Sequence, residues 1–218
     1  MTDFAAARHN MIEGQIRTNK VTDPALLDAF AALPREQFVP AERRSAAYVD
    51  EDLRLKDERF LMEPMVLARL LQTAEPTRTD VALDVGCATG YATAVLARLT
   101  ATAIGLENDA ALVRTAAETL ARLSIDNAIV VEGALDAGFS KHGPYDVILV
   151  GGAVAEFPPA LLDQLAEGGR LVGVRRPPSG PGAAMLMLKR HGVVAGRTLF
   201  EAATPYLAGF APKPRFVF

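Results

Sequence analysis

The pattern of hydrophobic and polar positions divides the chain into two parts. In residues 1–75 apolar side chains recur at helical spacing, for example over 4–17, and no stretch alternates in the manner of a strand. Asp23 followed by Pro24 is typical of a helix start, and another helical pattern covers 65–71. We therefore expect the first 75 residues to form a helical cap made of helices and loops.

Beyond residue 76 short apolar runs alternate with helical patterns. This alternation predicts an α/β fold of the Rossmann-like, doubly wound type, with a mostly parallel sheet. We expect one domain over 1–218, in which 76–218 form a cofactor-binding core that ends in a hairpin (183–189 with 193–200) and a terminal strand (214–218). The expected strands are 81–85, 101–106, 128–131, 147–150 and 170–174, and the expected helices are 92–99, 110–123 and 159–166.

Composition narrows the classes of partner. The 218 residues are 50% hydrophobic and 22% charged with a formal net charge of −3, which suits one domain with a substantial core. A slightly acidic chain without clustered Lys and Arg predicts no nucleic-acid partner, and the lack of a long apolar span predicts no membrane contact. The single cysteine, Cys87, excludes an internal disulfide and favours a cytoplasmic location. The three histidines lack metal-ligand spacing, so no metal is expected.

The segment 81–91 has the composition of a strand, a tight turn and a helix start. An apolar run ends at Asp84, small residues follow, and an Ala-rich helical pattern begins near Tyr91. Small side chains let a ligand approach the backbone closely, and the helix start offers free N–H groups to an anionic group. A second apolar run ends at Glu107, whose carboxylate can accept both hydroxyl groups of a ribose. The pattern predicts a nucleoside-bearing ligand held by Asp84, Gly86, Cys87, Ala88, Gly90, Tyr91 and Glu107.

The dinucleotide fingerprint Gly-x-Gly-x-x-Gly fits this turn poorly. Starting at Gly86, it requires glycine where the chain has Ala88 and Tyr91. The negative charge of Asp84 would repel a pyrophosphate, but it suits the ammonium of a methionine moiety. The turn therefore favours S-adenosylmethionine over NAD or FAD, with an ordinary strand–turn–helix as the alternative. Cys87 is expected to fill space rather than act as a nucleophile, and Tyr91 either packs over the cofactor or only begins the helix.

Separate motifs then carry a family resemblance. The chain resembles the protein-L-isoaspartate O-methyltransferases from residue 8 to about residue 174. The resemblance implies a class I methyltransferase fold, S-adenosylmethionine as cofactor, and methyl transfer to the α-carboxylate of an isoaspartyl residue in a damaged protein. Such a carboxylate is already ionised, so the reaction needs orientation and exclusion of water rather than a general base. The similar stretches are Leu33-Pro-Arg-Glu-Gln-Phe-Val-Pro40, Ala47-Tyr48-x-Asp50, Leu83-Asp-Val-Gly-Cys-Ala-Thr-Gly-Tyr91, Tyr145-Asp-Val-Ile-Leu-Val150 and Leu162-Asp-Gln-Leu-Ala-Glu-Gly-Gly-Arg-Leu-Val172.

The chain departs from the family in the segment expected near the acceptor. The family's active-site loop resembles Thr-Ile-Ser-x-Pro, whereas this chain has Phe60-Leu61-Met62-Glu63-Pro64. Met62 stands at the position of the serine, and a thioether cannot donate the hydrogen bond that would orient a carboxylate. Glu63 would repel an anionic substrate if it faced the site.

Two further departures concern the cofactor. Where the family resembles Gly-Asp-Gly, with the acid on the adenine amine, this chain has Gly133-Ala134-Leu135. Backbone groups at Ala134 and Leu135, or the side chain of Asp136, are expected to take the place of the acid. Ala88 replaces the middle glycine of the turn, which is costly only if φ is positive there.

Three functions are compatible with these residues. The first is isoaspartyl methylation with a rearranged loop. The second is a methyltransferase of the same fold with another acceptor, and the third is a cofactor-binding protein with little catalysis. The oligomeric state is left open by the sequence.

Overall fold

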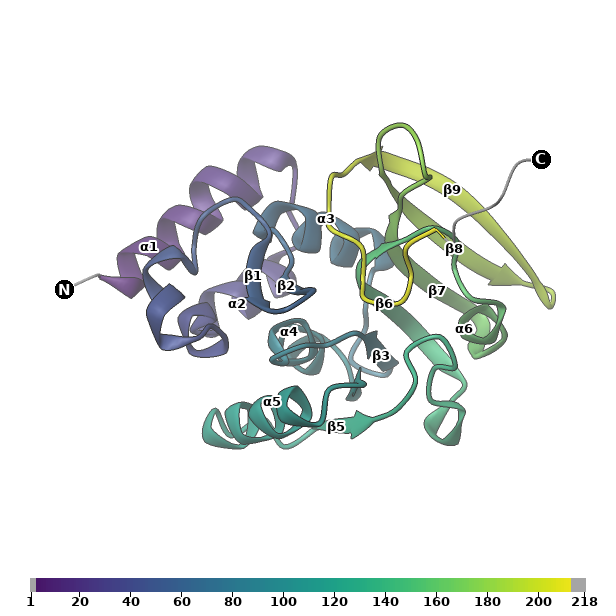
Figure 1. Ribbon diagram of the computed structural model, residues 1–218, viewed down its shortest axis with the longest axis horizontal. Coiled ribbons are helices and arrows are strands. Elements are labelled where there is room, and N and C mark those ends of the chain that lie inside the picture. Colours follow the sequence, from purple (N-terminus) through teal and green to yellow (C-terminus); the bar gives the residue numbers. More distant parts are fainter. Residues whose placement is uncertain (1–2, 213–218) are drawn as a thin grey trace.

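The computed structural model describes residues 3–212, and the expected terminal strand at 214–218 lies outside them. The seven-stranded sheet runs through the middle of the molecule, with the N-terminal helices at one end and a long antiparallel hairpin at the other (Figure 1). The first five strands across the sheet are parallel and the last two are antiparallel. The strand order across the sheet is β5 (Ala128–Glu132), β4 (Thr102–Glu107), β3 (Val81–Val85), β6 (Tyr145–Val154), β7 (Leu165–Arg175), β8 (Ala183–Arg190) and β9 (Val193–Glu201).

The expected doubly wound α/β fold and the hairpin near the end of the chain are thus confirmed. Asp23 caps α2 by accepting the Leu26 N–H at 2.8 Å, and Pro24 is the first residue of that helix, as the sequence predicted. The expected helix over 4–17 begins as α1, continues as a π-helical segment (Ile12–Ile16), and ends in a 3₁₀ turn (Arg17–Asn19). The α-helices are α1 (Phe4–Met11), α2 (Pro24–Ala32), α3 (Pro64–Ala74), α4 (Tyr91–Leu99), α5 (Ala110–Arg122) and α6 (Pro159–Asp163), and further 3₁₀ turns cover Arg35–Phe38, Ala41–Ala46 and Ser140–His142.

The prediction that residues 1–75 contain no strand is wrong. β1 (Leu53–Lys56) and β2 (Arg59–Leu61) form a separate antiparallel hairpin beside the carboxyl ends of the parallel strands. β1 alternates buried and exposed side chains over only four residues. So short an alternation, set among charged residues, is hard to distinguish from a loop in the sequence.

The helix expected over 159–166 is shorter than predicted. α6 ends at Asp163, and Leu165 already belongs to β7. Leu165 lies opposite Tyr145 of β6, and the Gln164 carbonyl accepts the Tyr145 N–H at 2.8 Å. Pairing with the neighbouring strand therefore overrides the helical pattern at this point.

Alternation along β3 decides where its acid points. Ala82 packs into the cluster formed with α3, α4 and the cap, whereas Leu83 and Val85 pack into the cluster on the opposite face of the sheet. Asp84 has the parity of Ala82, so its side chain faces α4. The fold thereby directs this carboxylate into the interior rather than along the rim of the sheet.

Candidate active site

The turn after β3 requires glycine at two positions. Gly86 has φ +77° and Gly90 has φ +88°, both in the left-handed region that glycine adopts readily. A Cβ on Gly86 would also come within 2.5 Å of Leu207 Cδ1. Gly90 immediately precedes α4. These glycines let the chain reverse tightly between β3 and α4.

Ala88 occupies the same turn with φ +49°. Its N–H donates to Glu107 Oε2 at 3.1 Å, so the turn closes onto the end of β4. The left-handed conformation brings the Ala88 Cβ close to its own backbone, and the sequence had identified positive φ here as the costly case. The alanine is tolerated, but under strain.

We expect Ala88→Gly to raise the free energy of unfolding by about 1 kcal/mol, because glycine relieves that strain. Chemical denaturation measures the change. Ala97→Gly, inside α4, is the matched control and should lower the free energy of unfolding by about the same amount. Equal losses at both positions would contradict the strain at Ala88.

Asp84 is a buried carboxylate with one unused oxygen. It is 0% exposed, and its Oδ2 accepts the Thr93 hydroxyl of α4 at 2.6 Å. Among the described residues Oδ1 has no hydrogen-bond partner. Burial, with a smaller contribution from the charge of Glu107, raises the pKa of the Asp84 carboxyl to about 7. A buried acceptor without a partner is rare in folded proteins, and a cationic group bound here would satisfy it.

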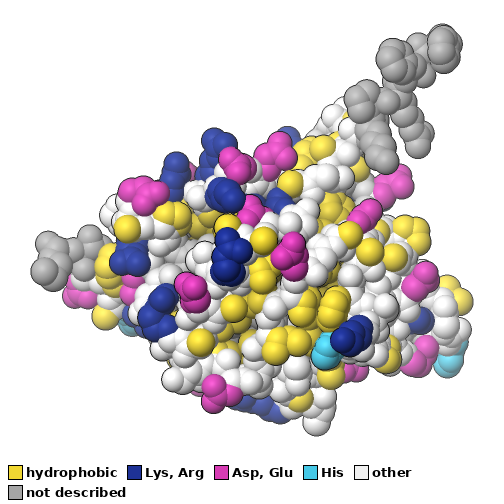
Figure 2. Space-filling view, turned by 60° about the horizontal axis from the view of Figure 1, so that its bottom comes forward, with side chains coloured by type: hydrophobic (Ala, Val, Ile, Leu, Met, Phe, Trp, Pro, Cys, Tyr) yellow, Lys and Arg dark blue, Asp and Glu magenta, His cyan; other side chains and the backbone are white. Residues whose placement is uncertain are grey.

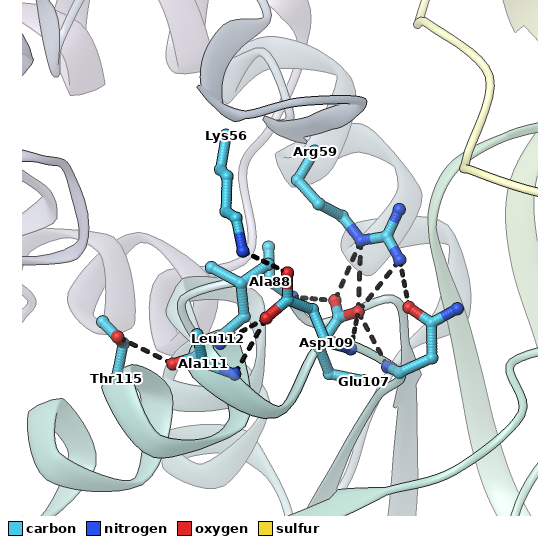
Figure 3. Close-up of polar contacts among 9 residues, drawn as sticks. Lys56, Arg59, Ala88, Glu107, Asp109, Ala111, Leu112 and Thr115 are labelled. Atoms are coloured by element: carbon cyan, nitrogen blue, oxygen red, sulfur yellow. Dashed lines mark hydrogen bonds and ion pairs between the residues drawn. The ribbon is translucent and has the colours of Figure 1, made fainter.

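Glu107 ends β4 and is fully buried, so it is no ordinary surface acid. Arg59 of the β1–β2 hairpin pairs with it: Arg59 Nη2 lies 3.0 Å from Glu107 Oε1, and Arg59 Nε lies 3.1 and 3.2 Å from the two carboxylate oxygens. The N–H groups of Ala88 and Asn108 also donate to this carboxylate, at 3.1 and 2.8 Å. Figure 3 shows Arg59 and Lys56 pointing from the hairpin toward Glu107 and Asp109. The groups expected to receive a ribose are therefore occupied by a side chain of the protein itself.

Two small cavities lie inside the hairpin and meet at Met62. One, of about 20 Å³, is lined by Asp84, and the other, of about 10 Å³, is lined by Asp52 and Thr204. Phe60, Met62 and Gly151 line both cavities. Outside the hairpin a much larger open hollow of about 550 Å³ is bounded by residues 56–59, Asn108, Asp109 and Ala208.

Thr204 brings an unpartnered hydroxyl to the smaller cavity. The residue is 2% exposed, and within the described part of the chain its Oγ1 has no hydrogen-bond partner. Met62 is also buried at 5% exposed, and its carbonyl accepts Arg35 Nη2 at 2.8 Å. Met62 and Thr204, from distant parts of the chain, thus line the same cavity.

The acidic residues beside Met62 differ in their placement. Glu63 is half-buried and does not line either small cavity, although burial and then the charges of Asp50, Asp52 and Glu51 raise its pKa to about 7. Asp52 does line the cavity that contains Thr204, and its Oδ1 accepts the Glu63 N–H at 3.0 Å. Two acids therefore line this cavity, the partly buried Asp52 and the exposed Glu58, and the sequence did not single out either of them.

Cys87 and Tyr91 are both buried within the site. Burial raises the pKa of the Cys87 thiol well above its usual value, so the thiol stays protonated, in agreement with a space-filling role. Tyr91 begins α4, and its ring packs against Phe38 with centroids 5.3 Å apart and under the Arg35 guanidinium at 4.8 Å. Tyr91 also lines the cavity of Asp84, so it serves both packing and the cavity wall.

The segment after β5, expected to contact the adenine, is partly exposed and meets the end of β4 through its backbone. Ala134 and Asp136 are exposed, whereas Leu135 is buried in the cluster on the second face of the sheet. The Gly133 N–H donates to the Glu107 carbonyl at 3.0 Å, which brings this segment beside the end of β4. Backbone contact with an adenine at Ala134 and Leu135 stays a prediction.

The surface is mixed in charge. Figure 2 shows Lys and Arg side chains interspersed with Asp and Glu over the face it presents. Over residues 3–212 no group of three or more His, Cys, Asp or Glu is placed to hold a metal ion. In the same part of the chain, no helix combines the length and the apolar character needed to cross a bilayer.

Comparison with known proteins decides the family. The family described as "Protein-L-isoaspartate(D-aspartate) O-methyltransferase (PCMT)" matches residues 6–201. The chain belongs to this family. It is 40% identical over 172 residues to the protein-L-isoaspartate O-methyltransferase of Koribacter versatilis, covering 79% of this chain and 78% of that protein. It is 39% identical over 192 residues to the enzyme of Methylorubrum populi, covering 88% of each.

Solved structures agree with the family. A protein-L-isoaspartate O-methyltransferase superposes with a TM-score of 0.82 at 27% identity, covering 93% of this chain, which spans 66% of that one. A Plasmodium falciparum protein crystallised with S-adenosyl-L-homocysteine superposes with a TM-score of 0.78 at 21% identity, covering 95% of this chain and 99% of that one, which supports the fold. The expected family, methyltransferase fold, S-adenosylmethionine-dependent activity and cofactor are confirmed by these matches.

The residues present fit this cofactor in chemistry, although the hairpin closes the space. Asp84 offers a buried oxygen for an ammonium, the turn at Gly86 presents bare backbone, and Glu107 offers a carboxylate for ribose hydroxyls. Pockets for small ligands commonly hold about 300–1,000 Å³. The cavity of about 20 Å³ beside Asp84 is far smaller than such a pocket.

The structure also brings to the candidate site residues whose contacts the sequence did not predict. Arg59 precedes the segment 60–64, but nothing local indicates that it pairs with an acid 48 residues away. Thr204 carries no motif. Arg35 lies in the similar Pro-Arg-Glu segment; it donates to the Ala47 and Met62 carbonyls, whereas Glu36 accepts the Tyr48 hydroxyl.

Proposed function

We propose that this methyltransferase transfers a methyl group to the carboxylate of isoaspartyl residues in proteins or peptides. One observation carries the proposal: two buried compartments meet at Met62, one with the free oxygen of Asp84 and the other with the free hydroxyl of Thr204. Family membership over residues 6–201 supports the same reaction. The polar groups of the first compartment suit the cofactor's ammonium and those of the second suit the acceptor, although neither cavity has the volume of a ligand pocket.

The side chains of the protein position the reactants rather than activate them. S-adenosylmethionine supplies an electrophilic methyl group. Asp84 and Glu107 would hold the cofactor's ammonium and ribose hydroxyls, and the apolar Phe60 and Met62 would keep water from the space that both cavities share. A carboxylate acceptor is already ionised and needs no general base, so the protein contributes orientation, which is worth up to about 7–11 kcal/mol of the barrier.

Thr204 replaces the function of the missing serine in this proposal. A hydroxyl group can donate one hydrogen bond to an acceptor carboxylate, which Met62 cannot do. Thr204 lines the same cavity as Met62 and is already desolvated. The hydroxyl needed for orientation therefore comes from the segment after β9 rather than from the loop before α3.

We expect Thr204→Val to lower kcat/KM for an isoaspartyl peptide by about 10- to 150-fold, the value of one hydrogen bond to a charged group. Affinity for S-adenosylhomocysteine should stay unchanged, and stability should hold or rise because a buried unpartnered hydroxyl is removed. Thr204→Ser should retain activity, and Met62→Ser in the Thr204→Val protein should restore part of it.

Thr100→Val is the matched control for this experiment. Thr100 is equally buried, but its hydroxyl donates to the Leu96 carbonyl at 2.8 Å at the far end of α4. Loss of the Thr100 hydroxyl should change the free energy of unfolding without changing kcat/KM for the isoaspartyl peptide. Equal kinetics in Thr204→Val and the unmodified protein would remove Thr204 from the acceptor site.

Asp52 favours a second candidate acceptor, because it puts a carboxyl group into the acceptor cavity. Burial raises the pKa of this carboxyl, which indicates an environment unfavourable to further negative charge. A neutral or cationic acceptor group would then be the substrate. Comparing methylation of an isoaspartyl peptide with that of the same peptide carrying an amine at this position separates the two candidates.

The cytoplasmic location stays a proposal based on the single buried cysteine.

A further inference from the structure

The tip of the β1–β2 hairpin is fixed to the core by two charged side chains. Arg59 pairs with Glu107 and also donates to Asn108, and Lys56 pairs with Asp109. The first pair is almost completely buried, with side chains 8% and 0% exposed, whereas the second is open to solvent. Both anchors lie on the strand end and loop where a nucleoside would bind (Figure 3).

The hairpin packs on the core through the leucines at its base and through Leu55 near its tip. Leu53 and Leu61 are buried in the main cluster, whereas Lys56, Asp57 and Glu58 at the tip are exposed. The two strands form no ladder with the seven-stranded sheet, and an isolated pair of strands is only marginally stable by itself. The Arg59 and Lys56 contacts therefore hold the tip together with the packing of Leu55, which lies directly before Lys56 and is buried in the same cluster.

The hairpin separates the open hollow from the inner cavities. On its outer side lies a space of about 550 Å³, and on its inner side the two cavities hold about 20 and 10 Å³. Arg59 borders the outer hollow and the cavity of Thr204, and it covers the carboxylate of Glu107. Rotation of this one side chain away from Glu107 would expose the ribose-binding carboxylate and open the way inward.

We propose that Arg59 is a latch that competes with the cofactor for Glu107, so that the hairpin opens when S-adenosylmethionine binds. This proposal rests on the cofactor site of the proposed function. The guanidinium neutralises a buried carboxylate in the free protein, which would otherwise be an unpaired buried charge. In the bound protein ribose hydroxyls take over the carboxylate, and the released guanidinium reaches solvent at the hairpin tip. The Arg59–Glu107 pair therefore keeps the hairpin closed over the site in the protein without cofactor.

Calorimetric titration with S-adenosylhomocysteine tests the latch. Affinity is reduced by the fraction of molecules that are closed, so Arg59→Ala should bind about tenfold more tightly than the unmodified protein or better. Lys56→Ala, which removes only the exposed anchor, should bind slightly more tightly. Arg54→Ala is the matched control: this arginine of the same hairpin donates to the Asp57 carbonyl and does not contact the core, so affinity should not change.

A measurement on the unmodified protein keeps the test independent of the variants' stability. The Arg59 Nε–H proton, assigned by its absence in Arg59→Lys, should exchange slowly with solvent in the free protein because it is ion-paired and buried. Saturating S-adenosylhomocysteine should make it exchange rapidly. Slow exchange in both states, or equal or weaker binding by Arg59→Ala, would overturn the latch.

These outcomes are separable from failure of the proposed function. An isoaspartyl peptide that is not methylated, with tighter binding in Arg59→Ala, would remove the acceptor assignment and leave the latch intact. Methylation of the peptide together with unchanged binding in Arg59→Ala would overturn the latch and leave the acceptor assignment intact. Absence of S-adenosylhomocysteine binding in every variant would overturn the cofactor site on which both depend.

Discussion

Glu107→Gln is expected to lower both the stability of the free protein and its affinity for S-adenosylhomocysteine. Removing one partner of a buried ion pair commonly costs about 3–5 kcal/mol in the free energy of unfolding. We expect the lower end of this range, because Arg59 lies at a hairpin tip and can turn toward solvent. The uncharged amide also places an NH₂ group among backbone N–H donors from Ala88 and Asn108, where only acceptors are useful.

The affinity loss has a separate cause. A hydrogen bond to a charged group contributes about 1.5–3 kcal/mol, so loss of the carboxylate should weaken binding by about 10- to 150-fold. Denaturation and calorimetry measure the two effects. Glu132→Gln is the matched control, since Glu132 lies beside Glu107 on β5 but is exposed, and it should change neither quantity. Unchanged stability in Glu107→Gln would show that the Arg59 pair contributes nothing to the fold.

Asp84→Asn is expected to abolish most cofactor binding. Truncating one partner of a buried, hydrogen-bonded charge pair costs about 2–5 kcal/mol, or about 30-fold to several thousand-fold in affinity. Asparagine retains the size of the side chain and the bond to Thr93, so the loss reports the charge rather than the shape. Asp126→Asn, exposed at the amino end of β5 on the opposite edge of the sheet, should bind normally.

The pH dependence of the same carboxyl provides a second measurement. Because its pKa is raised to about 7, affinity for S-adenosylhomocysteine should fall about tenfold between about pH 8 and about pH 6, as the ionised fraction falls. Stability should change in the opposite direction. An acid whose folded pKa lies above its unfolded value of about 4 binds more protons when folded, so the free energy of unfolding falls as pH rises from about 4 to about 7.

Asp84→Asn should remove the pH dependence of affinity and reduce that of stability, part of which remains because the pKa of Glu63 is also raised to about 7. In Asp84→Asn the affinity should be low at every pH, and the stability relative to the unmodified protein should be most favourable above about pH 7. A pH-independent affinity in the unmodified protein would mean that Asp84 does not meet the cofactor's ammonium group.

The position of Arg59 changes how the departures from the family are interpreted. Read from the sequence, Met62 and Ala134 suggested a site losing polar groups at both ends. In the structure Glu107, the acid expected to bind ribose, is buried and paired with Arg59. Thr204 brings a hydroxyl to the cavity that Met62 lines, where the family's serine is absent. This arrangement supports the proposal that residues of other segments supply the polar groups missing at the expected positions.

The sequence alone determined the family and the parallel sheet, and it predicted where the cofactor site would lie. Strand, turn and helix over 81–99 follow from local composition, and Asp84 and Glu107 must come together because parallel strands end at the same edge of a sheet. Only the tertiary structure decided the rest. The φ of Ala88 is set by closure of the turn onto Glu107, and the contact of Arg59 with Glu107 joins residues 48 positions apart. The meeting of Thr204 with Met62 depends on packing between segments, because periodicity records which face of an element is buried but not which distant side chain lies against it.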